Sequence, residues 1–342
     1  MRIPSILVGF AALTHLTVGA EEPAAPAEAH VIEVARPYVE GDAFYEDTTL
    51  RINQHAIEAT EAGESTTTTN AAHIRFIGDQ LVTKVTPGGI PSSLLIRIER
   101  LEVSSFDNGK KAEQPDTLLE KGSWVIAESV GGEVAFTNTD GTKFENAQAT
   151  NILDELIGLR DEDPALPLTT TLALGPEHPR RPGESWKLDP AANAKAMSSR
   201  KYPLTPDDIA GYATYMGKVE SHGRPCDRLS YTYSIDTTRH QNMKMERFDR
   251  VSYHRIITLD LPEDPNLKEN HFTMSRWVRY DQSNPAPESP TAPATSSLVY
   301  EMLYQTDVLE IEGEQLEILR AKHAELQAKE AAEAPAQAKE PT

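Results

Sequence analysis

The 342-residue sequence is poor in cysteine, in basic residues and in apolar residues: it has one cysteine, 33 Lys and Arg against 53 Asp and Glu, and 39% apolar residues. One cysteine excludes an intrachain disulfide framework, a CxxC redox pair and a zinc site built from several cysteines. The net charge of −20 argues against binding to nucleic acid, which needs clustered Lys and Arg. The apolar fraction is below the globular average of about 45–50%, so part of the chain is expected to lie outside any core.

Long apolar runs are also missing, even at the N-terminus. Residues 1–20 are interpreted as a signal peptide, because Arg2 precedes a short apolar run and Val18-Gly19-Ala20 precedes Glu21. The run is shorter than the ~20 residues that span a bilayer. The sequence therefore predicts an exported protein, periplasmic or extracellular, with no transmembrane segment in the mature chain. Residues 21–41, which begin with Pro, Ala and Glu, are predicted to be a flexible spacer.

Between residues 42 and 312 the apolar residues alternate with polar ones, which is typical of strands with one face on a core. Turn signals such as Asn108-Gly109 and His222-Gly223 separate the alternating segments, and strands joined by tight turns run antiparallel. We therefore expect a mainly β fold, a curved antiparallel meander, in one body or in two similar halves over 42–175 and 176–312. The clearest alternating apolar residues are Leu229, Tyr231, Tyr233 and Ile235; Val251, Tyr253, Ile257, Leu259 and Leu261; Phe272, Met274, Val278 and Tyr280; and Leu298, Tyr300, Met302 and Tyr304.

Helices are expected to be few and short. Residues 150–160 place five apolar side chains on one helical face, residues 191–200 favour a second helix, and Thr205-Pro206 resembles the start of a third. The Pro-rich residues 283–295 are predicted to form a long loop. Residues 313–342 are predicted to be a tail, helical after Gly313 and then disordered, and this helix either lies in solvent or binds a partner.

The segment from Pro176 to Trp186 contains Pro-Arg-Arg-Pro-Gly-Glu-Ser-Trp at residues 179–186. It resembles the "Pro … Pro-Gly-Glu/Asp-x-Trp" segment of uncharacterised secreted β-rich bacterial proteins of the planctomycete and verrucomicrobia type. In those proteins the segment follows a short helix and precedes a strand hairpin, which here would join residues 212–220 and 226–235. The resemblance implies export and β architecture, and it implies no catalytic residue.

Motifs that would indicate an enzyme are weak. Gly183-Glu184-Ser185-Trp186 lacks the second glycine of a nucleophile elbow, because Lys187 stands there, so Trp186 is expected to fill the core instead. Cys226 is expected to be a small half-buried residue. Asp260 and Glu301 are interpreted as ordinary charges on a sheet surface.

Two parts of the sequence contain residues that could bind a metal. A set of His and Met side chains could suit copper, and Asp161-Glu162-Asp163 could attract calcium but lacks the spacing of an EF-hand loop. Alternation separates the His from the Met residues on a strand, so we predict no metal, no cofactor and no catalytic residue. The copper candidates are His240, Met243, Met245, His254, His271 and Met274.

Two functional hypotheses remain. The first is an exported, non-enzymatic protein that binds an apolar ligand or an envelope protein, or that has a structural role in the cell envelope. Its basis is the long alternating strands rich in Tyr, Met and Phe, with too few helices to cover both faces of a sheet. The alternative is an exported hydrolase whose site is assembled from separated residues.

Overall fold

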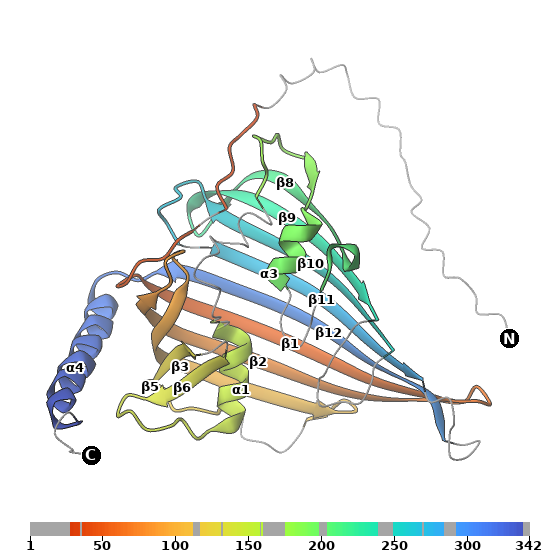
Figure 1. Cartoon of the computed structure of the whole chain (residues 1–342), viewed down its shortest axis with the longest axis horizontal. Helices are drawn as coiled ribbons and strands as arrows, with labels where there is room; N and C mark the ends of the chain where they lie inside the picture. The colour runs from red at the N-terminus through yellow and green to blue at the C-terminus, as the bar shows by residue number, and fades with distance from the viewer. Residues whose placement is uncertain are drawn as a thin grey trace.

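The computed structural model describes residues 28–34, 36–111, 117–130, 133–157, 159, 175–197, 204–238, 249–268, 270–283 and 292–337. Within these residues the protein forms one large open antiparallel sheet of 12 strands (Figure 1). The strand order is β6-β5-β3-β2-β1-β12-β11-β10-β9-β8-β7, and β4 pairs with β3. The mainly β, antiparallel meander predicted from alternation is confirmed.

The sheet is made of two meanders that meet at its centre. β1 and β12 pair from Phe44 opposite Glu310 to Thr60 opposite Pro293, so the first and last strands of the body join the meanders, and β6 and β7 form the edges. The first meander contains β1 (Ala43–Thr60), β2 (Ser65–Val85), β3 (Pro91–Asp107), β4 (Lys110–Lys111), β5 (Ser123–Val130) and β6 (Glu133–Asn138). The second contains β7 (Ser185–Lys187), β8 (Ile209–Ser221), β9 (Arg224–Thr237), β10 (Arg250–Pro262), β11 (Asn270–Ser283) and β12 (Pro293–Glu310).

Strand register defines two faces, which we call inner and outer. One cross-strand row of the inner face consists of Leu50, Tyr304, Met274, Ile257 and Tyr231, on β1, β12, β11, β10 and β9. Since successive side chains point to opposite faces, the intervening residues lie on the outer face. The alternating apolar residues predicted from sequence on β9 to β12 all belong to the inner face.

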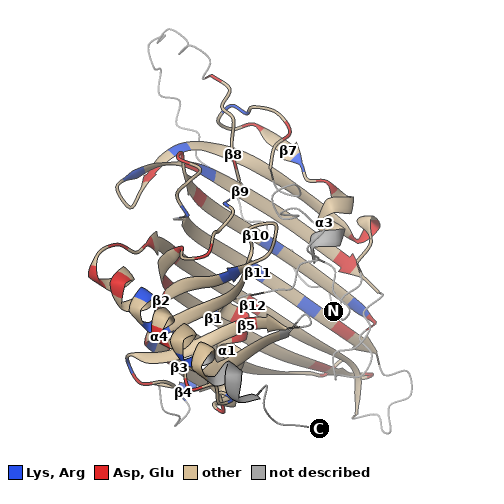
Figure 2. Cartoon of the chain, turned by 60° about the vertical axis from the view of Figure 1, so that its left-hand side comes forward, with Lys and Arg blue, Asp and Glu red and all other residues tan. Residues whose placement is uncertain are grey.

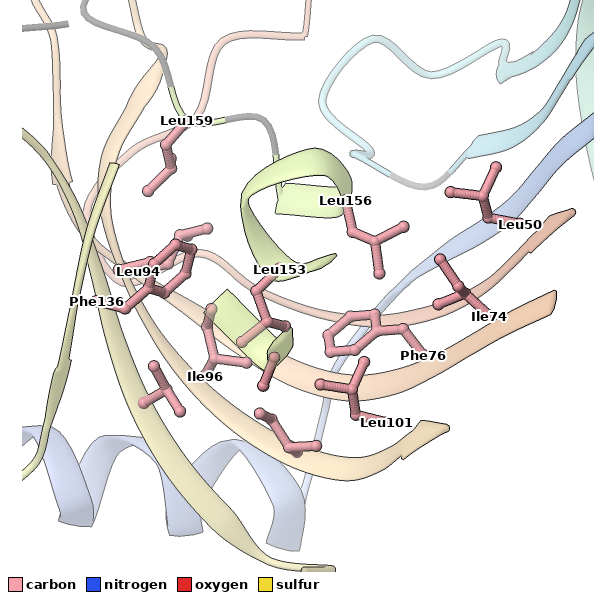
Figure 3. Close-up of a cluster of buried hydrophobic side chains, with 14 of the residues drawn as sticks. Leu50, Ile74, Phe76, Leu94, Ile96, Leu101, Phe136, Leu153, Leu156 and Leu159 are labelled. Carbon is pink, nitrogen blue, oxygen red and sulfur yellow. The ribbon is translucent and has the colours of Figure 1, made fainter. Parts of the chain in front are cut away.

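Helix α1 (Ala147–Ile157) covers the inner face of the first meander. It begins earlier than residue 150 because the Asn146 side chain accepts a hydrogen bond from the Ala149 amide (3.0 Å), which caps the first turn. Leu153 and Leu156 point from the helix toward Phe76 and its neighbours in the sheet (Figure 3). Leu153 is fully buried, so this helix anchors the largest core.

The second meander has a core of its own on the inner face. Trp186 is 8% exposed and packs with Tyr215 and Tyr231, as the sequence predicted for this tryptophan. Helix α3 (Pro190–Met197) lies beside this core, where Ala194 packs against Ile209 and Ile235.

The helix expected after Thr205-Pro206 is not formed. The structure has a single 3₁₀ turn, Pro206–Asp208, and β8 follows directly. The Asp208 carboxylate accepts hydrogen bonds from the Thr205 amide and hydroxyl (2.7 and 2.8 Å), so the cap seen in the sequence is real. The chain then pairs with β9 instead of coiling, and as alternate residues of this strand Ile209 packs with Ala194 and Ile235 while Ala213 enters the core around Trp186.

The end of the predicted spacer is attached to the sheet. Ile32 is 7% exposed within the second core. His30 and Arg180 exchange two backbone hydrogen bonds of 2.8 Å, and His30 Nε2 lies 3.1 Å from the Asp227 carboxylate. This part of the predicted spacer is therefore packed and not flexible, because Ile32 and Val34 supply apolar area that the preceding Pro/Ala/Glu residues lack.

The tail helix α4 (Glu314–Gln337) packs on the outer face of the first meander, at the left of Figure 1. Leu319 is fully buried against Leu81 and Leu95, and Leu316 and Leu326 contact the same cluster. The alternative of a helix that lies in solvent is therefore wrong, because the side of α4 that carries Leu319 packs on the sheet. None of the described helices is both long and apolar enough to cross a membrane.

Candidate functional site

On the inner face, α1 packs on the first meander and α3 lies beside the core of the second meander. Figure 1 shows α1 and α3 on the same side of the sheet, with β1, β12, β11 and β10 crossing between them. Figure 2 shows basic positions on these strands. We call the inner-face residues of β10, β11 and β12 between the two helices the central strip.

Two arginines occupy positions of the central strip where alternation requires apolar residues. Arg255 follows Tyr253 and precedes Ile257 on the inner face of β10, and Arg276 lies between Met274 and Val278 on β11. Arg255 and Arg276 are direct cross-strand partners. Side chains at opposed positions have Cβ atoms about 4.5–5.5 Å apart, and like charges placed there are destabilising. The sheet therefore holds two cations together on an otherwise apolar and aromatic surface.

The arginines are short of partners. Arg276 Nη2 is 3.7 Å from Glu155 of α1, whose side chain is 53% exposed, and it also contacts the Met302 sulfur. The Nε atoms of Arg255 and Arg276 are both buried without a hydrogen-bond partner. Among the described residues no carboxylate lies within salt-bridge distance of Arg255. A guanidinium group has five donors and no acceptor, so the pair can still bind an anion.

Tyrosines border the arginines on the same face. Tyr233 is opposite Arg255 on β9, and Tyr231 is two residues away on the same strand. Burial raises the pKa values of Tyr231, Tyr233 and Tyr304, so their hydroxyl groups stay protonated and can donate. The Tyr231 hydroxyl is buried and has no hydrogen-bond partner, which costs about 1–3 kcal/mol in a folded protein.

An apolar surface continues from the arginines along the strands. Val278 and Tyr280 follow Arg276 on β11, and Leu298 and Tyr300 lie opposite them on β12. Tyr280 and Tyr300 form an edge-to-face pair with ring centroids 6.1 Å apart. The central strip thus combines a cationic group with a neighbouring apolar and aromatic surface, which is the chemistry of an amphiphile-binding site.

Two other polar groups on the inner face are satisfied and act structurally. Glu46 is 7% exposed and accepts hydrogen bonds from Thr48 (2.7 Å) and Gln80, and burial raises its pKa. Asp227 accepts a 2.7 Å hydrogen bond from the Tyr215 hydroxyl and contacts His30. Neither carboxylate lies within salt-bridge distance of Arg255 or Arg276.

The structure separates the histidines and methionines considered for copper. Met274 is buried on the inner face, whereas His254 and His271 lie on the outer face. His271 contacts Asp307 there, with 2.5 Å between Nδ1 and Oδ1. His240, Met243, Met245 and the segment Asp161-Glu162-Asp163 lie outside the described residues.

The residues considered for catalysis have ordinary surroundings. The Ser185 hydroxyl on β7 is 2.8 Å from the Thr214 hydroxyl, and Cys226 is 3% exposed. Glu301 is an exposed sheet charge, as expected, but Asp260 is 1% exposed and makes two 2.7 Å hydrogen bonds to Arg228. Asp260 is therefore a buried ion-pair member and not a surface charge. The hydrolase alternative stays a prediction.

Comparisons with known proteins give little further guidance. No protein-family model matches the sequence, and no curated protein matches it. Among solved structures, lipovitellin, studied for its lipid–protein interactions, is similar over 80% of this chain at 8% identity and a TM-score of 0.35. The matched region is only 25% of the lipovitellin chain, so this chain spans about a quarter of its length.

Two bacterial proteins match with still lower scores. An outer membrane channel from Pseudomonas putida F1 matches 82% of this chain and 100% of its own, with 8% identity and a TM-score of 0.20. A FadL homologue from Pseudomonas aeruginosa matches 79% of this chain and 91% of its own, with 8% identity and a TM-score of 0.14. At such low scores the likenesses carry no argument about function.

Proposed function

We propose that the protein is an exported, non-enzymatic binding protein that holds an amphiphile with an anionic head group on the inner face of its sheet. The carboxylate or phosphate of the ligand binds Arg255 and Arg276, and its apolar chain lies along the half-buried Tyr280, Leu298 and Tyr300. The observation that carries the proposal is the cross-strand arginine pair with its unpartnered Nε atoms. An anion bound by both guanidinium groups replaces repulsion with charge-assisted hydrogen bonds.

The opposite charge of the whole chain strengthens the argument. The protein carries 20 net negative charges, so random placement would put carboxylates near any arginine. The outer-face arginines of the same strands do have close partners: Arg250 pairs with Asp236, and Arg279 pairs with Asp281 at 2.7 Å. The two inner-face arginines of these strands share one such partner among the described residues, Glu155 at 3.7 Å from Arg276, and Arg255 has none. Arg255 and Arg276 therefore remain available to an anionic group that does not belong to the chain.

The test is a binding measurement with three probes of equal chain length: oleate, lyso-oleoyl phosphatidic acid and neutral mono-olein. Each is titrated below its critical micelle concentration and followed by calorimetry and by native mass spectrometry of the complex. We expect saturable binding of one or both anionic probes and at least tenfold weaker binding of mono-olein, because only an anion can accept from the arginines. Comparison of oleate with the phosphate probe distinguishes the two head groups, and inorganic phosphate alone tests whether the apolar chain is needed.

Matched variants locate the site. Arg255→Gln and Arg276→Gln should each weaken binding of the anionic probe about tenfold or more, because a charge-assisted hydrogen bond contributes roughly 1.5–3 kcal/mol. Arg250→Gln and Arg279→Gln lie on the outer face of the same two strands and should leave binding unchanged. Circular dichroism confirms that each variant is folded. Binding that is absent for all probes, or equal in the inner-face and outer-face variants, contradicts the proposal.

A further inference from the structure

A second group of side chains lies on the outer face, away from the central strip. His222, His271 and Asp307 each offer one ligand atom, and these atoms lie within 4.8 Å of one another. Asp307 Oδ1 is 2.9 Å from His222 Nε2 and 2.5 Å from His271 Nδ1. The three residues come from the β8–β9 turn, from β11 and from β12. Two imidazole nitrogens thus converge on one carboxylate oxygen from three separate elements.

The turn that contains His222 does not itself require a histidine. His222 and Gly223 have φ values of 51° and 75° and join paired strands through a two-residue turn, which is the geometry that favours Asn-Gly. The same chain uses Asn108-Gly109, with φ values of 45° and 80°, between β3 and β4. Asparagine, aspartate and histidine are the non-glycine residues enriched at positive φ, and Asn-Gly is the pair most favoured in this turn type. Asparagine would therefore suit this turn position at least as well. The histidine that stands there directs its imidazole ring to His271 and Asp307.

The sheet register supplies the other two ligand positions. His271 and Asp307 are direct cross-strand partners on β11 and β12, so their side chains meet on the outer face without any rearrangement. His271 is also opposite Asp260 on β10. Asp260 is 1% exposed and accepts hydrogen bonds of 2.7 Å from Nε and Nη2 of Arg228. Arg228 thus neutralises the deeper carboxylate and leaves Asp307, with its side chain 25% exposed, as the accessible anionic ligand.

We propose that His222, His271 and Asp307 bind one divalent transition-metal ion, with Zn²⁺ as the best match. Two imidazoles and one carboxylate are a recurrent ligand set for zinc, at about 2.0–2.2 Å from the ion, with the fourth position taken by water. The ring centroids of His222 and His271 are 6.2 Å apart, so the two rings can reach one ion between them. The ion would replace the present hydrogen bonds to Asp307 and would fasten the β8–β9 turn across β10 to β11 and β12.

The experiment uses the full chain, with any affinity tag removed, after treatment with EDTA and dialysis. Zn²⁺ is titrated by calorimetry, and Co²⁺ is titrated in parallel because its visible absorption reports ligand number and geometry. We expect one Zn²⁺ per chain, a rise in the thermal midpoint with added metal, and a Co²⁺ spectrum of a four- or five-coordinate site. Binding to the native state alone raises stability with metal concentration, so the two readouts must agree.

The decisive variant is His222→Asn, because asparagine suits the turn and the variant is expected to fold at least as well as the wild type. It should weaken Zn²⁺ binding by at least tenfold, since loss of an outer-shell partner alone costs 10–100-fold in metal sites. Asp307→Asn should do the same. His254→Asn, an exposed outer-face histidine of β10 that is not part of the group, should leave binding unchanged.

Two results would overturn the proposal. One is the absence of saturable Zn²⁺ binding and of any metal-dependent thermal shift in the wild type, which would leave a His–Asp–His hydrogen-bond network only. The other is binding that persists in His222→Asn and is lost in His254→Asn, which would place the ion elsewhere. Neither result bears on the amphiphile site, because the two groups of residues lie on opposite faces of the sheet.

Discussion

The ligand-free protein should become more stable when one of the two inner-face arginines loses its charge. In Arg255→Met the side-chain stem is kept, so packing against Tyr233 and Ile257 is largely preserved, while the guanidinium group is removed. Most substitutions at half-buried positions destabilise a protein, by about 0.5–3 kcal/mol. An increase in stability on substitution of Arg255 would therefore indicate repulsion between Arg255 and Arg276.

The size of the effect follows from the register. The two residues are direct cross-strand partners, with Cβ atoms about 4.5–5.5 Å apart, and the Arg276 guanidinium contacts the Met302 sulfur on β12, the strand on the side away from Arg255. Two like charges at about 7 Å repel by roughly 0.6 kcal/mol in water and roughly 2.4 kcal/mol at an effective dielectric constant of about 20. Arg276 is partly compensated by Glu155 at 3.7 Å, so we expect a net gain of about 1 kcal/mol. In a protein of this size that is a rise of about 2 °C in the thermal midpoint.

Salt dependence and a double-mutant cycle identify the cause. Urea unfolding is measured for the wild type, Arg255→Met, Arg276→Met and the double variant, at low and at high salt. If repulsion is the cause, the double variant gains less than the sum of the singles, and the gain shrinks at about 1 M salt, where the screening length is near 3 Å. The same substitution should weaken binding of an anionic amphiphile. Destabilisation by Arg255→Met that is equal at both salt concentrations would refute the reasoning.

Further predictions concern the packing that holds the two faces in place. Leu153→Ala should cost about 2–5 kcal/mol in urea unfolding, because the fully buried side chain anchors α1 and leaves a cavity. Leu319→Ala should speed proteolysis of α4 without unfolding the sheet, which limited digestion with mass spectrometry would show. Tyr215→Phe should cost about 1.5–3 kcal/mol in the same unfolding assay, because the charged acceptor Asp227 loses its hydrogen bond. Burial raises the pKa of Glu46, so the folded state binds the proton more tightly than the unfolded chain. The free-energy cost of burying the ionised Glu46 side chain is absent below about pH 4 and increases as the pH rises through the folded-state pKa. Glu46→Gln should therefore stabilise the protein at pH 7 and have little effect at low pH, and a constant effect across the pH range would contradict this.

Alternation gave the strands of the second meander and their faces. Tyr231, Tyr233, Met274 and Tyr304 all lie on the inner face, because a period of two fixes side-chain direction once a strand forms. Alternation carries no information about which strands are neighbours. The pairing of β1 with β12 joins residues about 250 positions apart in the sequence, and nothing in either strand's own pattern indicates its partner.

The mean composition of the chain ends underestimates how much they pack on the sheet. Residues 28–34 and α4 follow or contain Ala- and Glu-rich sequence, so the average composition suggests a solvated chain. A few apolar side chains are enough to dock each of them: Ile32 enters the second core, and Leu319 enters the outer-face cluster. The mean composition of ten or more positions hides the contribution of one buried apolar residue.

The signal for the inner-face site was present in the sequence as a gap in the alternation. The apolar series on β10 runs from Val251 and Tyr253 to Ile257, and it omits Arg255. The series on β11 omits Arg276 in the same way. Each gap alone resembles an ordinary polar interruption of a strand. Only the register, which places both arginines side by side, turns two interruptions into a cationic pair.

The two proposed sites share a physical logic, because each contains a residue that its own strand or turn does not require. Arg255 interrupts an apolar face beside another cation, and His222 occupies a turn position that asparagine fills elsewhere in the same chain. Residues that satisfy the fold alone, such as Trp186 and Leu153, obey the patterns of their elements. Natural proteins place such local conflicts at functional sites, where a ligand compensates them. Since a conflict on one face of a sheet cannot relieve a conflict on the other, the arginine pair and the His–Asp–His group call for two different ligands, one anionic and one cationic.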